Sequence, residues 1–215
     1  DARSRLIGAS YLDGAVIEYG YDLAGHRARI EGYLNPDPGY AGSNIDVELD
    51  TPNVAGLALL FDIDGLPEEP MKLSAMLRQE GKGLAFRTSQ GSVGEITLAI
   101  DGHMPDLNEP TGVDADFDVR LPSLTLLAFL APDTDWPDLP FSARGRFDHE
   151  QVRTRLENVQ LELGMFAADV SGELFTDRRF AVTVAARGPD ASQLEPWVGR
   201  PLPPAPEASP ERLSS

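Results

Sequence analysis

Three histidines have side chains that could bind a metal or transfer a proton. His26, His103 and His149 lie far apart in the sequence, each beside a turn predicted from neighbouring polar residues. Two histidines four residues apart, or a His-x-His pair, would favour a metal site, whereas isolated histidines near turns are mostly solvated. We therefore predict no catalytic residue and no metal ligand among them.

Two groups of aspartates could bind a cation. The segment Asp62-Ile63-Asp64-Gly65 resembles the start of a calcium loop, but its glycine occupies the fourth position instead of the sixth and no glutamate follows at the twelfth. Asp114, Asp116 and Asp118 alternate along a predicted strand, where a solvated face explains them better than a cation site does. We therefore predict no metal here either.

Signatures of enzymes are missing from the sequence. It contains no Gly-x-Ser-x-Gly elbow, no phosphate-binding glycine loop and no dinucleotide fingerprint. No two carboxylates are marked as partners for glycoside hydrolysis. Trp136 and Trp197 stand beside prolines, where we expect each to wedge a connection against the sheet. We interpret the chain as a protein without enzymatic activity and without a cofactor.

Charge and composition exclude further classes. The 215 residues include 18 Lys and Arg against 35 Asp and Glu, a net charge of −17. This balance argues against binding to nucleic acid and against docking on anionic headgroups, since both require a basic face. The chain has no cysteine. The longest apolar run, Val54 to Phe61, falls short of the ~20 residues that span a bilayer. The start at Asp1-Ala2-Arg3, with no Met and no charged-then-apolar leader, suggests an excised piece or a processed product of a longer protein.

The elements that would position any site are strands. Apolar and polar residues alternate over long stretches, as in strands with one buried and one solvated face. The clearest runs lie at 113–121, 141–147, 159–163, 166–174 and 180–186, and further runs at 17–23, 28–34, 45–49, 71–77, 84–88 and 96–100. Asp148-His149-Glu150 and 176–179 are expected hairpin breaks. Short helices are expected near 123–130 and 191–199, and the apolar segment 54–61 is expected to form either a short helix or a strand.

The strand pattern repeats along the chain with a long period, roughly 70 residues. A strand, a proline, an apolar segment and a Pro-flanked return occur first from Ile45 to Met71 and again from Phe117 to Phe141. Such a repeat predicts an array in which each unit packs on its neighbours. We expect one elongated segment over 1–206, with units at 1–44 (partial), 45–112, 113–179 and 180–206 (partial), followed by a flexible end at 207–215.

A wide apolar face follows from these strands. Eight or nine residues at ~3.3 Å each span ~26–30 Å, comparable to a lipid tail. Few helices are expected to cover this face, so it must close on itself, meet a second sheet or remain open as a groove. A sandwich core and a channel for apolar molecules are both compatible with the sequence.

Several motifs resemble the repeat of the AsmA family of envelope proteins. They are Leu156-Glu157-Asn158-Val159-Gln160-Leu161-Glu162-Leu163-Gly164, Ala168 to Leu174, Phe180 to Asp190, Leu194 to Pro203 and Pro137 to Gly145. The resemblance implies the periplasmic body of a protein anchored in the inner membrane of Gram-negative bacteria, with a curved, taco-like sheet and a hydrophobic groove that moves phospholipid towards the outer membrane. The anchor and both terminal regions of that family are missing, so the chain would be a middle segment.

Our prediction is therefore a mainly β protein, a curved antiparallel sheet of repeated strand modules with short crossover helices, located in the periplasm. Its apolar face would bind phospholipid acyl chains. The candidate groove residues are Leu98, Ile100, Phe117, Val119, Phe141, Leu161, Leu163, Val170, Val182 and Val184. Two other interpretations remain open: an adhesion or scaffold array of closed sandwiches, with aspartates binding calcium, and a carbohydrate-active jelly roll, which the few aromatic residues disfavour.

Overall fold

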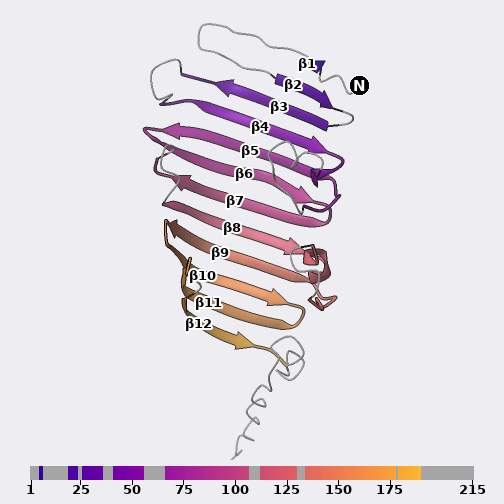
Figure 1. Cartoon of the computed structure of the whole chain (residues 1–215), viewed down its shortest axis with the longest axis vertical. Coiled ribbons are helices and arrows are strands. Elements are labelled where there is room, and N and C mark those ends of the chain that lie inside the picture. Colours follow the sequence, from indigo (N-terminus) through magenta and orange to yellow (C-terminus); the bar gives the residue numbers. More distant parts are fainter. Residues whose placement is uncertain are drawn as a thin grey trace, which may run out of the picture.

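The computed structural model describes residues 5–6, 19–23, 26–35, 41–55, 66–106, 112–129, 134–177 and 179–189, with side chains from Arg27 onward except that of Ser89. The described strands form one twelve-stranded sheet in which each strand pairs with its neighbour in sequence. Every pairing is antiparallel (Figure 1). The predicted class, a mainly β protein built on a curved antiparallel sheet, is confirmed.

The strands lengthen from the N-terminal end towards the middle of the sheet. Their bounds are β1 Arg5–Leu6, β2 Tyr19–Leu23, β3 His26–Tyr33, β4 Asn44–Thr51, β5 Met71–Glu80, β6 Gly83–Val93, β7 Ile96–Met104, β8 Val113–Leu121, β9 Phe141–Glu150, β10 Arg153–Leu163, β11 Phe166–Phe175 and β12 Phe180–Arg187. A 3-10 helix, η2, covers Leu124–Leu127.

The register between strands places the alternating residues of the sequence on two separate faces. In antiparallel sheets, residues directly opposite each other project to the same side. Ile45 of β4 lies opposite Leu77 of β5, and Leu121 of β8 lies opposite Phe141 of β9. The polar residues between them, such as Glu48 of β4, are exposed on the other side. The sheet therefore has an apolar face and a polar face.

The predicted repeat is present in the structure as a matching set of hydrogen bonds. The amide of Val54 donates to the carbonyl of Glu69 at 2.8 Å, and one repeat later Leu124 donates to Leu139 at 2.9 Å. The amides of Gly42 and Gly112 likewise donate to the carbonyls of Gln79 and His149. The units expected at 45–112 and 113–179 each contribute four strands, β4–β7 and β8–β11.

Two equivalent glycines close the hairpins between β6 and β7 and between β10 and β11. Gly94 has a φ of 56° and Gly164 a φ of 57°, in the left-handed region that favours glycine. Their amides donate to the carbonyls of Pro70 and Pro140, at 2.7 and 2.9 Å. Each glycine thus ties its two-residue turn to the residue just before the second strand of its unit, β5 or β9.

Several predicted strand ends were wrong. β10 begins at Arg153 instead of near Val159, because a bulge between Glu157 and Gln160 absorbs an extra residue. Asn158 adopts a φ of 51° at this bulge. The expected break at Asp148-His149-Glu150 is part of β9, and the turn follows it at 151–152.

The expected crossover helix at 123–130 is present only as η2. Ser123 caps it, with its side chain accepting a hydrogen bond from the amide of Thr125. Residues 54–55 are helical in the equivalent connection. The rest of the apolar segment at 54–61, the expected helix at 191–199 and the end at 207–215 lie outside the described residues.

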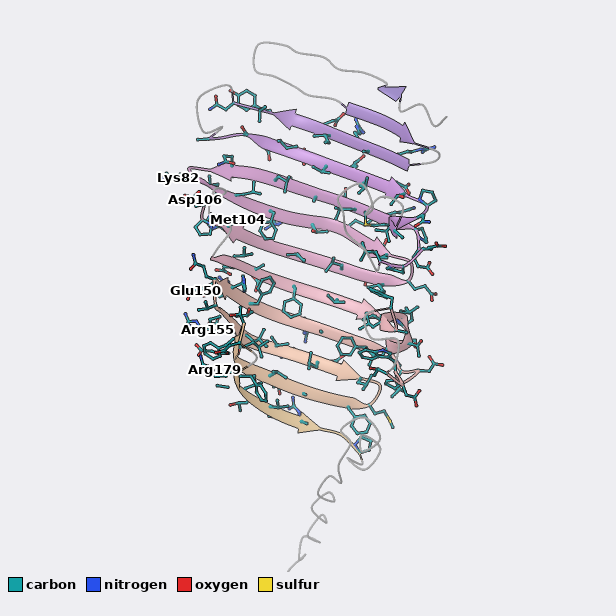
Figure 2. All side chains as sticks on the ribbon, viewed as in Figure 1. Lys82, Met104, Asp106, Glu150, Arg155 and Arg179 are labelled. Carbon is teal, nitrogen blue, oxygen red and sulfur yellow. The ribbon has the colours of Figure 1, made fainter. Side chains whose placement is uncertain are left out.

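The two long edges of the sheet differ in their connections. The connections from β4 to β5 and from β8 to β9 lie at one edge, together with the turns at Gly94 and Gly164 (Figure 1). The opposite edge carries the hairpin turns from β5 to β6, β9 to β10 and β11 to β12. The labelled side chains of Lys82, Asp106, Glu150 and Arg179 follow this second edge in Figure 2. We call these the crossover edge and the hairpin edge.

Candidate functional site: the apolar face of the sheet

The ten predicted groove residues all lie on the apolar face. Within β7 and β8, Leu98 is opposite Val119 and Ile100 is opposite Phe117. Phe141 follows on β9, opposite both Leu121 and Leu163. The remaining members continue the same face across β10, β11 and β12, namely Leu161, Val170, Val182 and Val184. The register thus brings all ten to one side of the sheet, while their contact with a lipid stays a prediction.

Further residues share this face but were not among the ten. They include Leu73, Leu77, Phe86, Phe147 and Leu156. The rings of Phe117 and Phe147 lie 6.1 Å apart between centroids, on neighbouring strands β8 and β9. Alternation could have identified Leu73 and Leu77, whereas the parity of Leu156 is displaced from that of Val159 by the bulge.

Most side chains on the apolar face are only half-buried. The described strands form a single sheet, so this face meets no second sheet within the described ranges. Burial is deepest at Ala115 and Leu121 on β8, which are 1% and 3% exposed, and it falls off to 59% exposure at Val184 on β12. The closed sandwich that one alternative required is thus not found in the part of the chain that the structure describes. An apolar surface of this extent is typical of a binding surface.

The connection between β8 and β9 covers the crossover edge of the apolar face. Leu124 of η2 is buried, and together with Trp136 and Leu163 it surrounds a hollow of about 220 Å³. Trp136 of the connection and Leu163 of β10 thus line the same hollow, while the wedge expected from the sequence stays a prediction. Trp197 lies outside the described residues. The crossover edge is consequently the more enclosed side of the apolar face.

The hairpin edge of the same face is more polar. His149 of β9 lies opposite Thr154 of β10, and its Nδ1 is 2.8 Å from the Thr154 hydroxyl. Gln79, one repeat before His149, occupies the equivalent place on β5 and donates to the carbonyl of Gly81. The expectation of solvated histidines at turns was wrong for two of them: His149 and His103 are half-buried within strands. The side chain of His26 is not described.

Ion pairs cover the polar face. Arg146 of β9 binds Asp114 and lies 3.8 Å from Asp116, both on β8. Arg120 donates to both carboxylate oxygens of Asp118, at 2.9 and 2.8 Å. These hydrogen bonds, and then the attraction between the charges, raise the pKa of Arg146 and of Arg120. The three aspartates are thus matched by arginines, as expected for a solvated face.

Cross-strand ion pairs extend this pattern along the sheet. Arg87 of β6 contacts Asp101 of β7 at 2.7 Å, and Arg187 of β12 contacts Asp169 of β11 at 2.6 Å. Opposite charges on adjacent strands favour the observed register. All of these groups are largely exposed, so each pair contributes little to stability by itself.

Across the described ranges, no three histidine or carboxylate side chains gather closely enough to hold a metal ion. The Asp62-Asp64 segment lies outside those ranges. No helix among the described residues combines the length and the apolar character needed to cross a membrane.

No family model, curated protein or solved structure matches this chain. The arrangement itself must therefore support any functional interpretation. Its main features are an apolar face of half-buried aliphatic and aromatic side chains, an opposite face that carries ion pairs, and one edge covered by connections. Such a surface can bind long apolar molecules by burial alone, without directional contacts.

Proposed function

We propose that this chain is a lipid-binding segment of an AsmA-like envelope protein and that its apolar face holds the acyl chains of phospholipids in transit. The observation that carries this proposal is the continuity of the apolar face from β3 to β12 on a sheet that stands as a single layer among the described residues. The ten candidate residues lie along that face.

Burial of methylene groups would supply the affinity. Each buried CH₂ contributes about 0.8 kcal/mol, and the aliphatic surface offers no fixed hydrogen-bond partner to a headgroup. We therefore expect binding of many phospholipids with little headgroup selectivity. The polar face, with its paired arginines and carboxylates, would keep the segment in solution while cargo lies on the other side.

In this proposal the chain resides in the periplasm, as part of a longer protein anchored in the inner membrane, and it transfers lipid towards the outer membrane. The motifs from Pro137 to Gly145 and from Leu156 to Leu174 support this interpretation. The chain would act without a cofactor and without catalysing a reaction.

Organic extraction of the purified chain followed by mass spectrometry tests the proposal. We expect phospholipids of mixed headgroup to be recovered, and a fluorescent fatty acid to bind the delipidated protein. A charge within the deeply buried part of the face would risk unfolding, so the structure favours polar substitutions at half-buried positions. Recovery of no lipid, together with no binding of the fluorescent fatty acid, would overturn the proposal.

A further inference from the structure

The small hollow at the crossover edge has apolar walls and a polar rim. Its volume is about 220 Å³, and its lining comes from the connection between β8 and β9 and from β10, namely Leu124, Thr134, Asp135, Trp136, Pro137 and Leu163. Leu124 is buried and Trp136 is half-buried, whereas Thr134 and Asp135 are exposed. The interior of the hollow therefore suits an apolar group.

The hollow continues the apolar face of the sheet. Leu163 lines the hollow and lies opposite Phe141 of β9, which lies in turn opposite Leu121 of β8. An apolar chain that follows the face towards the crossover edge thus meets Leu163 and then the walls formed by the connection. On a single sheet such a chain is covered from one side, whereas inside the hollow it would be covered from several. Each methylene group would therefore be buried more completely there.

The other end of the same strands is polar. His149 follows Phe141 by eight residues on β9, and its Nδ1 lies 2.8 Å from the hydroxyl of Thr154 on β10. Eight residues at ~3.3 Å each span ~26 Å. Half of a bilayer measures ~20–22 Å with its headgroups. A lipid whose methyl end lies in the hollow would thus bring its polar end to within about two residues of His149.

We propose that the hollow receives the methyl end of an acyl chain and thereby sets the chain length that this part of the sheet binds best. This inference rests on the proposed function, because it presupposes that the apolar face holds acyl chains. It adds a preference for chain length, which an open face alone would not impose. Thr134 and Trp136, whose side chains line the hollow, would determine that preference.

A closed end to the binding surface gives affinity a characteristic dependence on chain length. Each added methylene that becomes buried should raise affinity about fourfold, which corresponds to about 0.8 kcal/mol. Once the hollow is full, a further methylene stays in water and affinity stops rising. The length at which this happens should therefore move when the volume of the hollow is changed.

Competition of saturated fatty acids of increasing length against a fluorescent fatty acid, on the delipidated 215-residue chain, tests the inference. Thr134→Phe should fill the hollow and move the stopping point to shorter chains, with a loss of about fourfold in affinity for each methylene excluded. Trp136→Ala should enlarge the hollow and move the stopping point to longer chains. The matched control, Thr125→Phe, adds the same ring at an exposed position of η2 outside the lining and should leave it unchanged.

Tryptophan fluorescence tests the orientation of the bound chain. The sequence contains two tryptophans, so Trp197→Phe leaves Trp136 as the sole emitter. Bromine atoms placed near the methyl end of a bound fatty acid should quench Trp136 more strongly than bromine atoms placed near the carboxylate. Circular dichroism checks that every variant is folded, and the quenching comparison still decides if Thr134→Phe is not.

Two results would overturn the inference while leaving the proposed function in place. One is a folded Thr134→Phe variant with the chain-length dependence of the wild type. The other is quenching of Trp136 that is equal for the two brominated fatty acids or stronger for bromines near the carboxylate. In both cases the fatty acid is still bound. Absence of any fatty-acid binding would instead remove the proposed function and this inference with it.

Discussion

Val159 of β10 lies directly opposite Val170 of β11, and both are nearly fully buried although the described strands form a single layer. Their burial arises within the sheet. A Cβ added to Gly145, on β9, would come within 2.8 Å of a methyl carbon of Val159, so that valine fills the space that the glycine leaves. On the other side, Val170 faces Val184, which is 59% exposed. The burial of apolar side chains thus decreases from β10 through β11 to β12.

This gradient predicts unequal effects of the same substitution. Val159→Ala removes buried methyl groups and should lower the free energy of unfolding by about 1.5–2.5 kcal/mol. Val184→Ala should cost less than about 0.7 kcal/mol, because most of that side chain is already in water. Urea unfolding followed by circular dichroism measures both. Equal losses at the two sites would contradict the burial described here.

The two turn glycines should respond alike to substitution. Gly94→Ala and Gly164→Ala force a left-handed backbone on a residue with a Cβ and should each cost about 1–2 kcal/mol. The expected cost comes from the backbone conformation and not from a clash with neighbouring backbone, because the nearest atoms to an added Cβ belong to the side chains of Glu69 and Leu139, at 3.1 and 3.5 Å. Asparagine tolerates this backbone better, so Gly→Asn should recover part of the loss in thermal melts. Tolerance of alanine at either site would argue against the equivalence of the two turns.

The lipid proposal predicts a difference between neighbouring residues of β7. Leu98→Gln places an amide on the apolar face and should weaken binding of a fluorescent fatty acid several-fold, because a desolvated amide there lacks a partner. Ala99→Gln, one residue later on the exposed polar face, should leave binding unchanged. Titration of both delipidated variants, with melting temperatures as a check on folding, provides the comparison. Identical affinities would remove the apolar face from the binding site.

Arg146 should control the electrostatics of the polar face. Arg146→Gln leaves Asp114 and Asp116 close together without the cation that lies between them. The melting temperature of this variant should fall below that of the wild type at low salt and approach it at high salt, where repulsion is screened.

Calcium should leave the melting temperature of the wild type unchanged, because arginine already neutralises these carboxylates. A calcium-dependent rise in the wild type would instead favour the scaffold interpretation.

Alternation and repetition in the sequence were sufficient to predict the sheet, its two faces and the long period of the strand units. They succeeded because each strand has one solvated face, so that polarity changes at every residue. The segment from Asp114 to Arg120 illustrates this, because its acidic residues indicate the solvated face of the strand and Phe117 indicates the apolar face.

The irregular positions could not be predicted in this way. At Asn158 the bulge shifts parity by one residue, so Leu156 and Val159 share a face although an odd number of positions separates them. His149 reads as a turn residue beside Asp148 and Glu150, yet it extends β9 because Thr154 provides a partner across the strand pair. Both depend on contacts with neighbouring strands, which alternation does not encode.

The matched hydrogen bonds at Val54 and Leu124 have a consequence for how such a protein changes size. Because each of these connections follows the first strand of a four-strand unit, a duplication or deletion of one whole unit would leave strands and connections in the same order. Loss of a single strand would instead reverse the direction of the chain, and loss of two would join connections that do not match. The sheet could therefore lengthen or shorten during evolution in steps of four strands.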